Sequence, residues 1–195
     1  MIVRRAKQVR PEKSDRRKER MNSKTRNMTV CAIMAALMCI LGPMSVPIGP
    51  IPISLTNLVI YLTVYLLGTK KACISYLVYM LLGAVGLPVF SGFAGGIGKL
   101  AGPTGGYLVG FIFMTVICGV IMERFQRKAI PTWLGMVLGT LVAYLFGTVW
   151  FVVQTQSAIM YALTACVFPF IPFDLIKITI AILLGKAVRK RLPFE

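Results

Sequence analysis

Long apolar runs alternate with short polar connections along most of this 195-residue chain. A helix that spans a membrane needs about 20 predominantly apolar residues. The pattern predicts six such helices, at residues 28–46, 54–67, 72–87, 105–122, 130–153 and 172–188. A further apolar piece, residues 158–168, ends at Pro169 and is either a short interfacial helix or the first half of a broken sixth span. We therefore expect an all-α fold, a polytopic bundle of six transmembrane helices.

The composition favours a membrane protein over a soluble one. Hydrophobic residues make up 57% of the chain and charged residues only 14%, whereas soluble domains have about 45–50% and about 25%. A chain of this length cannot bury so much apolar surface in a single water-soluble core. The lipid bilayer is therefore its expected surrounding.

The positive charge of the chain is distributed as in a membrane protein. The formal net charge is +16, and half of the 22 Lys and Arg residues lie in the first 26 residues. The later connections alternate strictly between basic and nearly neutral: GTKK, ERFQRK and KAVRKR against PIGPIP, residues 89–103 and QTQS. Such alternation predicts that both termini are cytoplasmic, and it excludes nucleic acid as a partner.

The chain divides into three parts by composition. Residues 1–27 contain no apolar core of a signal peptide and are predicted to be a disordered basic tail. Residues 28–191 form the predicted membrane domain, and residues 192–195 form a short C-terminal tail.

The predicted outward connection between the third and fourth helices is unusually long and rich in glycine. It reads LPVFSGFAGGIGKLAGPTGGY, residues 87–107. A glycine-rich segment lets backbone approach a ligand closely, so this loop is either a lid over a site or a flexible linker. Its GGIGK stretch lacks the spacing and the Ser/Thr of a phosphate-binding loop, so the chain itself has no predicted ATP site.

Asp174 and Lys177 are the acid and base of FIPFDLIKITI, close to the start of the sixth predicted helix. Charged residues in a membrane are costly and usually face a partner or a cavity. Because they are three residues apart, the two side chains share one helix face. They form either a structural ion pair or a site that grips a polar ligand with one acceptor and one donor.

Other chemistry is sparse. The chain has no His, and its five Cys residues show no CxxC pair, so we expect packing thiols and neither a metal, a cofactor nor an enzyme active site. An intramembrane protease or lipid transferase would need a nucleophile–base pair or a pair of carboxylates in the membrane. With no His and a single acid in the predicted spans, the sequence gives such an enzyme little support. Ala32 and Ala36 have the small-residue spacing that lets helices approach closely, which serves either ordinary internal packing or docking of a partner.

Three segments together resemble the BioY family, the biotin-binding S-components of energy-coupling-factor transporters. They are GAVGLPVFSGFAGGIGKLAGPTGGYLVGF, the earlier IPISLTNL and the later FIPFDLIK. The resemblance covers residues 28–191. It implies a six-helix membrane subunit that binds biotin near the outer face of a bacterial or archaeal plasma membrane. It also implies two kinds of partner, an EcfT-like transmembrane coupling protein and a pair of ABC ATPases.

The resemblance also implies roles for single residues. Asp174 and Lys177 match the pair expected to bind the ureido ring, the glycine-rich loop matches the lid, and Ala32 and Ala36 match the docking motif. We add Lys99, the only cation of the loop, for the ligand carboxylate. The predicted ligand-binding set is Asp174, Lys177, Lys99, Phe90, Tyr107, Gly102 and Thr104.

The sequence leaves undecided one contact at which the chain departs from the family, and it leaves three alternative functions. Many relatives carry Gln near the position of Thr56, where this chain has Thr56–Asn57, so a contact from that position is in doubt. The alternatives are an S-component for another vitamin or for a precursor such as dethiobiotin, a membrane-embedded enzyme, and a structural subunit without a ligand.

Overall fold

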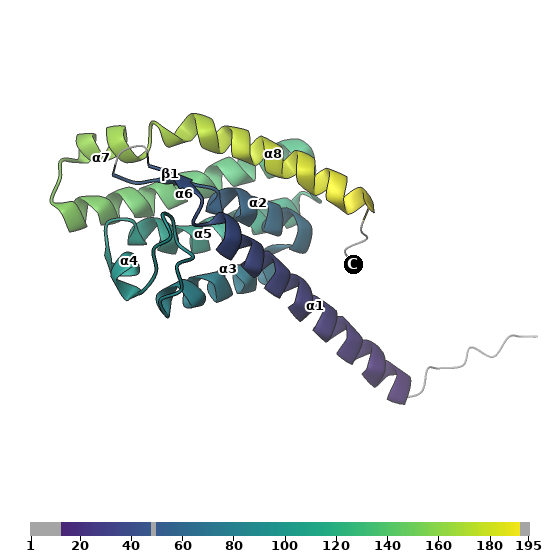
Figure 1. The fold of residues 1–195 in the computed structure, drawn as a ribbon. Coiled ribbons are helices and arrows are strands. Elements are labelled where there is room, and N and C mark those ends of the chain that lie inside the picture. Colours follow the sequence, from purple (N-terminus) through teal and green to yellow (C-terminus); the bar gives the residue numbers. More distant parts are fainter. Residues whose placement is uncertain (1–12, 48–49, 192–195) are drawn as a thin grey trace, which may run out of the picture.

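The computed structural model describes residues 13–47 and 50–191, and this part of the chain forms eight helices and one small sheet (Figure 1). The helices are α1 (Lys13–Leu41), α2 (Thr56–Leu67), α3 (Thr69–Ala84), α4 (Ile97–Ala101), α5 (Gly105–Arg124), α6 (Ala129–Thr155), α7 (Ile159–Cys166) and α8 (Phe170–Arg191). The strands β1 (Ser45–Val46) and β2 (Ile53–Ser54) pair antiparallel. The all-α prediction is confirmed.

The six predicted spans correspond to α1, α2, α3, α5, α6 and α8, but these helices differ in length. Three are long and apolar enough to cross a membrane: the Lys24–Leu41 part of α1, α5 and α6. The pair α7 and α8, bent by 42° at their junction, makes a fourth if it is one broken span. At 12 residues, α2 is apolar but short. Six crossings with both termini in the cytoplasm therefore stay a prediction.

Helix α1 differs from its prediction at both ends. It begins at Lys13, so residues 13–27, which we expected to be disordered, are helical; residues 1–12 and 192–195 lie outside the described part. It ends at Leu41 rather than at residue 46 because Gly42 and Pro43 follow. Proline has no N–H and disfavours helix in the residue before it. Ser45 and Val46 instead form the strand β1.

The apolar piece before the sixth predicted helix is a separate helix, α7. Helix α8 begins at Phe170, two residues earlier than predicted, and Pro172 lies in its first turn, where a missing N–H breaks no helical hydrogen bond. Asp174 is therefore near the N-terminal end of α8.

Helix α2 occupies the centre of the bundle, in contact with α1, α3, α5 and α8. Ile60, Tyr61 and Val64 of this helix are fully buried. Beside it α5 and α6 form the most extensive helix pair, and a Cβ added at Gly110 would lie only 3.0 Å from the Cα of Ala143. Glycine at this contact lets the two backbones approach closely, as is common between membrane helices.

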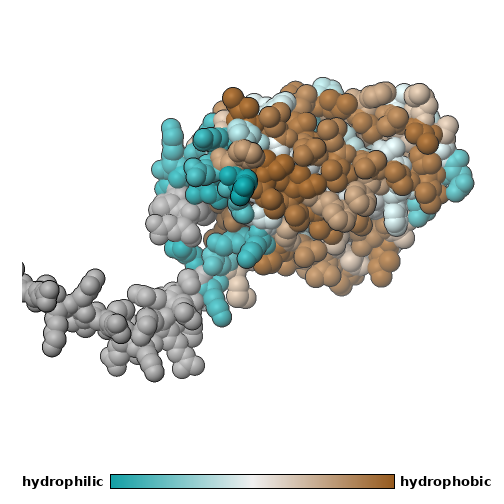
Figure 2. All heavy atoms as spheres, turned by 180° about the vertical axis from the view of Figure 1, so that it is seen from behind, coloured by the Kyte–Doolittle hydropathy of each residue, from teal (hydrophilic) through white to brown (hydrophobic). Residues whose placement is uncertain are grey.

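The outer surface is mainly hydrophobic, with a large group of hydrophilic residues at one end and a smaller group at the other (Figure 2). Large apolar side chains such as Leu81, Leu134, Leu145 and Leu183 are exposed. In water such a surface would drive aggregation, whereas lipid chains can cover it. The fold thus places its central helix and its buried polar residues inside an apolar belt.

Candidate ligand-binding site

A cavity lies where the small sheet meets the N-terminal ends of α2, α5 and α8. Its walls also include residues of α3, α6 and the glycine-rich loop. The lining residues are Ile51, Pro52, Ser54, Thr56, Asn57, Tyr79, Ser91, Thr104, Tyr107, Leu108, Phe111, Tyr144, Phe170, Asp174 and Lys177. Because three helix N-termini converge, their dipoles favour oxygen atoms and negative charge at this place.

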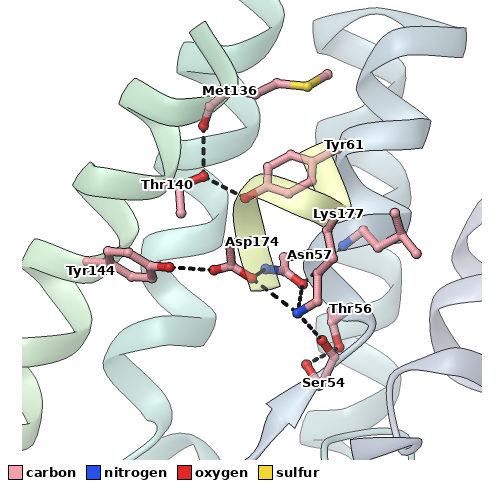
Figure 3. A network of polar contacts seen from close by, with 10 residues as sticks. Ser54, Thr56, Asn57, Tyr61, Met136, Thr140, Tyr144, Asp174 and Lys177 are labelled. Atoms are coloured by element: carbon pink, nitrogen blue, oxygen red, sulfur yellow. Dashed lines mark hydrogen bonds and ion pairs between the residues drawn. The ribbon is translucent and has the colours of Figure 1, made fainter. Parts of the chain in front are cut away.

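Asp174 and Lys177 form a buried ion pair on the cavity wall (Figure 3). The Nζ of Lys177 lies 3.1 Å from Oδ1 of Asp174, and the two residues are 7% and 4% exposed. They are one helical turn apart on α8, as their spacing predicts. The pair is neutral as a unit, which makes its burial tolerable.

Two side chains from other helices complete the bonding of Asp174. Asn57 on α2 donates from Nδ2 to Oδ1 at 2.6 Å, and the hydroxyl of Tyr144 on α6 donates to Oδ2 at 2.6 Å (Figure 3). Each carboxylate oxygen therefore has a donor from a different helix. Such bonds to a charged acceptor are shorter and stronger than those between neutral groups.

All three N–H donors of Lys177 are engaged. Besides Asp174, the ammonium donates to the backbone carbonyl of Ser54 at 2.8 Å and to Oδ1 of Asn57 at 3.1 Å. Lysine has three donors and no acceptor. A ligand that accepts a hydrogen bond from Lys177 must therefore replace one of these three partners.

The glycine-rich loop is tied to the bundle at several points rather than forming a flexible linker. Gly96 donates to the carbonyl of Gly83 at 2.7 Å, and Gly92 donates to that of Pro43 at 3.1 Å. Phe90 is fully buried and packs edge-on against Tyr79, with ring centroids 5.6 Å apart. A Cβ at Gly83 would collide with the Phe90 ring, so glycine makes room for this anchor.

The structure brings four of the seven predicted ligand residues to the cavity: Asp174, Lys177, Tyr107 and Thr104. The Thr104 hydroxyl is buried and has no hydrogen-bond partner among the described residues. The Tyr107 hydroxyl donates to the carbonyl of Cys166, at the end of α7, at 3.0 Å. Thr104 therefore offers a free polar group to a ligand, whereas the Tyr107 ring offers a fixed wall.

The other three predicted residues lie outside the cavity lining. Phe90 packs behind Tyr79, and the Gly102 carbonyl accepts the indole N–H of Trp150 at 3.0 Å. Lys99 is on the short helix α4 and is partly exposed. Phe90 and Gly102 thus hold the loop in place, and Lys99 lies on it.

Comparison with known proteins places this architecture in a family. The model of the BioY family matches residues 14–194. The chain belongs to the BioY family. It is 37% identical to the biotin transporter BioY of Thermotoga maritima over 85% of this chain and 96% of that protein, and 33% identical to the biotin transporter BioY2 of Lactococcus lactis over 88% and 94%.

The fold of this BioY-family chain also matches a solved structure, that of the S-component for biotin from an ECF-type ABC transporter. The TM-score is 0.81 at 30% sequence identity, and the match covers 87% of this chain and 93% of the other. The family resemblance read from the sequence is therefore confirmed, and the protein is embedded in a membrane.

Sequence reasoning missed three of the polar groups that meet the ion pair: Asn57, Tyr144 and the carbonyl of Ser54. Asn57 carried a usable signal, because it is an amide in an otherwise apolar helix and must find a partner in lipid or protein. A tyrosine among other aromatic residues of α6 carried no such signal. The backbone carbonyl was not predictable from residue type.

Ala32 and Ala36 are both exposed on α1 of this BioY-family chain. They therefore do not serve packing within the described bundle, which was one of the two interpretations.

The five Cys residues are free, and no group of His, Cys, Asp and Glu suited to a metal occurs among the described residues.

Proposed function

We propose that this BioY-family chain is the substrate-specificity subunit of an energy-coupling-factor transporter and binds biotin in the cavity beside Asp174 and Lys177. One observation carries the proposal: a buried, hydrogen-bonded charge pair lines a cavity in a protein whose relatives are named biotin transporters. Burying a charge pair inside a membrane bundle costs free energy, so such a pair usually serves a ligand or a structural need.

The chemistry of biotin suits the residues around the cavity. Its ureido ring has two N–H donors and one carbonyl acceptor. In the proposed pose, a carboxylate oxygen of Asp174 accepts from a ring N–H, and Lys177 donates to the ring carbonyl. Phe111, Phe170 and Tyr107 supply aromatic surface for the apolar bicycle.

Binding in this pose is an exchange of partners. Because every donor of Lys177 is engaged without ligand, the ureido carbonyl takes the place of one acceptor, and Oδ1 of Asn57 at 3.1 Å is the side-chain candidate. The amide of Asn57 then becomes free to turn toward the ligand. A ligand without a ureido carbonyl offers Lys177 no acceptor in exchange for the one that it displaces, which is a basis for selectivity.

The loop between α3 and α5 is proposed as the lid of the site. It contributes Ser91 and Thr104 to the cavity wall. The hydrogen bonds of Gly92 to Pro43 and of Gly96 to Gly83 hold the middle of the loop against the bundle. Ala32 and Ala36 on α1 are proposed to dock the transmembrane coupling protein, which carries the ABC ATPase pair. The proposed location is the cell membrane, with both termini in the cytoplasm.

A titration of the purified protein with a panel of ligands tests the proposal. Calorimetry should show tight binding of biotin, weaker binding of dethiobiotin, which keeps the ureido ring but lacks the fused sulfur ring, and no binding of unrelated vitamins. If dethiobiotin or another vitamin binds more tightly than biotin, the substrate assignment is wrong. If no small molecule binds, the interpretation as a structural subunit gains support.

A pair of tyrosine variants locates the site in the same assay. Tyr144→Phe removes the hydroxyl that bonds Asp174 and should weaken biotin binding by about 1–2 kcal/mol. Tyr161→Phe, at an exposed residue of α7 outside the cavity, should leave binding unchanged.

A further inference from the structure

The end of the bundle opposite the cavity is strongly basic. Nine Lys and Arg residues of the described chain are close to the helix ends there: Lys70, Lys71, Arg124, Arg127, Lys128, Lys186, Arg189, Lys190 and Arg191. Glu123 is the single acidic residue that the structure describes in the same segments. Figure 2 shows the larger of two groups of hydrophilic side chains at one end of the mainly hydrophobic surface. This excess of charge needs counter-ions.

A groove opens at this end between the last turns of α2 and α8. It is lined by Tyr65, Leu183, Lys186, Ala187, Arg189 and Lys190. The two helices pack closely beneath the groove: Gly185 of α8 lies against the ring of Tyr65, and a Cβ at this glycine would collide with that ring. The lining changes along α8 from apolar at Leu183 to basic at Lys186, Arg189 and Lys190.

Lys186, Arg189 and Lys190 form no ion pair with the described residues. Burial and the positive charge of Arg189 lower the pKa of Arg127, which lies in the connection between α5 and α6. The Nε of Arg127 is buried and has no hydrogen-bond partner among the described residues. The nearby carboxylate of Glu123 already accepts the N–H of Thr69, at the start of α3, at 2.8 Å. An added anion would relieve the repulsion between the two guanidinium groups.

We propose that this groove binds an anionic phospholipid, with its phosphate among Lys186, Arg189 and Lys190 and an acyl chain along Leu183. The order of the lining residues favours a lipid over a free anion. Leu183 is 61% exposed and lies one turn deeper in the bundle than Lys186, so the groove offers an apolar wall next to a basic rim. A soluble phosphate would use only the rim. Basic pockets between membrane helices are known to hold lipid headgroups in this manner.

The inference does not depend on which vitamin the cavity binds. It concerns the other end of the molecule, so failure of biotin binding would leave it intact, and its own failure would leave the proposed function intact.

Native mass spectrometry of the full chain in detergent, with lipids added at equal concentration, tests the proposal. The probes are phosphatidylglycerol, phosphatidylcholine with the same acyl chains, and glycerol 3-phosphate as the soluble headgroup. The expected result is retention of one phosphatidylglycerol at about tenfold lower concentration than phosphatidylcholine, with no retention of glycerol 3-phosphate. Equal retention of the two lipids would overturn a charge-selective site. Retention of glycerol 3-phosphate as strong as that of phosphatidylglycerol would overturn the lipid in favour of a soluble anion.

Three variants assign the site to the groove. The double variant Arg189→Gln and Lys190→Gln should abolish the preference for phosphatidylglycerol. Ala187→Phe, which fills the groove and keeps every charge, should do the same. Lys70→Gln, at an exposed lysine of the same end but outside the groove, should retain the lipid as wild type does. If Lys70→Gln loses as much preference as the double variant, a diffuse basic surface binds the lipid and the proposed groove does not.

Discussion

Asn57 donates a 2.6 Å hydrogen bond to Asp174 across 117 positions of sequence, and this contact joins α2 to α8 on the wall of the cavity. The same oxygen of Asp174 also faces the ammonium of Lys177, which in turn donates to Asn57. Three side chains on two helices thus form a closed triangle. Inside a membrane protein such a triangle is tolerated because the central helix α2 is shielded from lipid by its neighbours.

The triangle predicts the effect of neutralising Asp174. Asp174→Asn leaves the Lys177 ammonium buried without an opposite charge, and breaking a buried pair costs about 3–5 kcal/mol. We expect biotin binding to be lost and the melting temperature to fall. Calorimetry and thermal unfolding in the same detergent measure the two effects.

A double variant separates the two effects. Asp174→Asn with Lys177→Met removes both charges, so it should regain much of the lost melting temperature and none of the biotin binding. Wild-type affinity in the single variant would show that the pair is structural and that the ligand lies elsewhere.

Removing the Thr104 hydroxyl should weaken biotin binding without lowering the stability of the protein. Thr104→Val keeps the shape of the side chain and removes a buried hydroxyl that has no partner among the described residues. We expect the melting temperature to stay the same or to rise, while biotin binding weakens by about 0.5–1.5 kcal/mol through the lost hydrogen bond.

Thr140→Val is the matched control for this variant. The Thr140 hydroxyl bonds the Met136 carbonyl at 2.7 Å and the hydroxyl of Tyr61 at 2.5 Å, so its removal should lower the melting temperature. Unchanged biotin affinity in Thr104→Val would remove Thr104 from the ligand-binding set.

The helices and the charge pair were predictable because both follow from local sequence. Long apolar runs define helices in a membrane, and Asp174 and Lys177 share a helix face through their spacing alone. The early end of α1 was also readable, since Gly42 and Pro43 stop a helix. The predicted first helix was nevertheless extended to residue 46, because Met44 and Val46 continue the apolar run.

The partners of the pair were not predictable because they depend on how distant helices pack. Asn57 reaches Asp174 only because α2 lies against α8, and Tyr144 reaches it from α6. Phe90 was expected to bind the ligand, yet its ring packs edge-on against Tyr79 and is not part of the cavity lining. Residue type indicates that a side chain needs a partner, but only the packing of helices decides which one it finds.

Gly147 controls the position of the Tyr107 wall. A Cβ at this glycine would collide with the Tyr107 ring, so Gly147→Ala should displace the ring and break its hydrogen bond to Cys166. We expect weaker biotin binding together with a lower melting temperature. Gly98→Ala is the control, because an added Cβ there has no atom within 4 Å. An unaffected Gly147→Ala variant would mean that the ring adapts and that Tyr107 does not shape the site.

Lys99 was predicted to bind the ligand carboxylate, but it lies on α4 and not on the cavity wall. If the valerate tail of biotin extends toward the loop, its carboxylate meets the only cation there. A partly exposed ion pair is worth about 0.2–1 kcal/mol and weakens with salt. Lys99→Gln should therefore lower biotin affinity by a few-fold at low ionic strength and less at high ionic strength.

A neutral ligand decides whether this effect comes from a contact with the carboxylate. Biotin methyl ester has the ureido ring and bicycle of biotin but no charge on its tail, so wild type and Lys99→Gln should bind it equally. The coupling between the lysine and the carboxylate is the difference between the two affinity losses. Lys70→Gln removes a charge from the opposite end of the bundle and should change neither affinity. If Lys99→Gln weakens the ester as much as the acid, Lys99 acts through the conformation of the loop and another group receives the carboxylate.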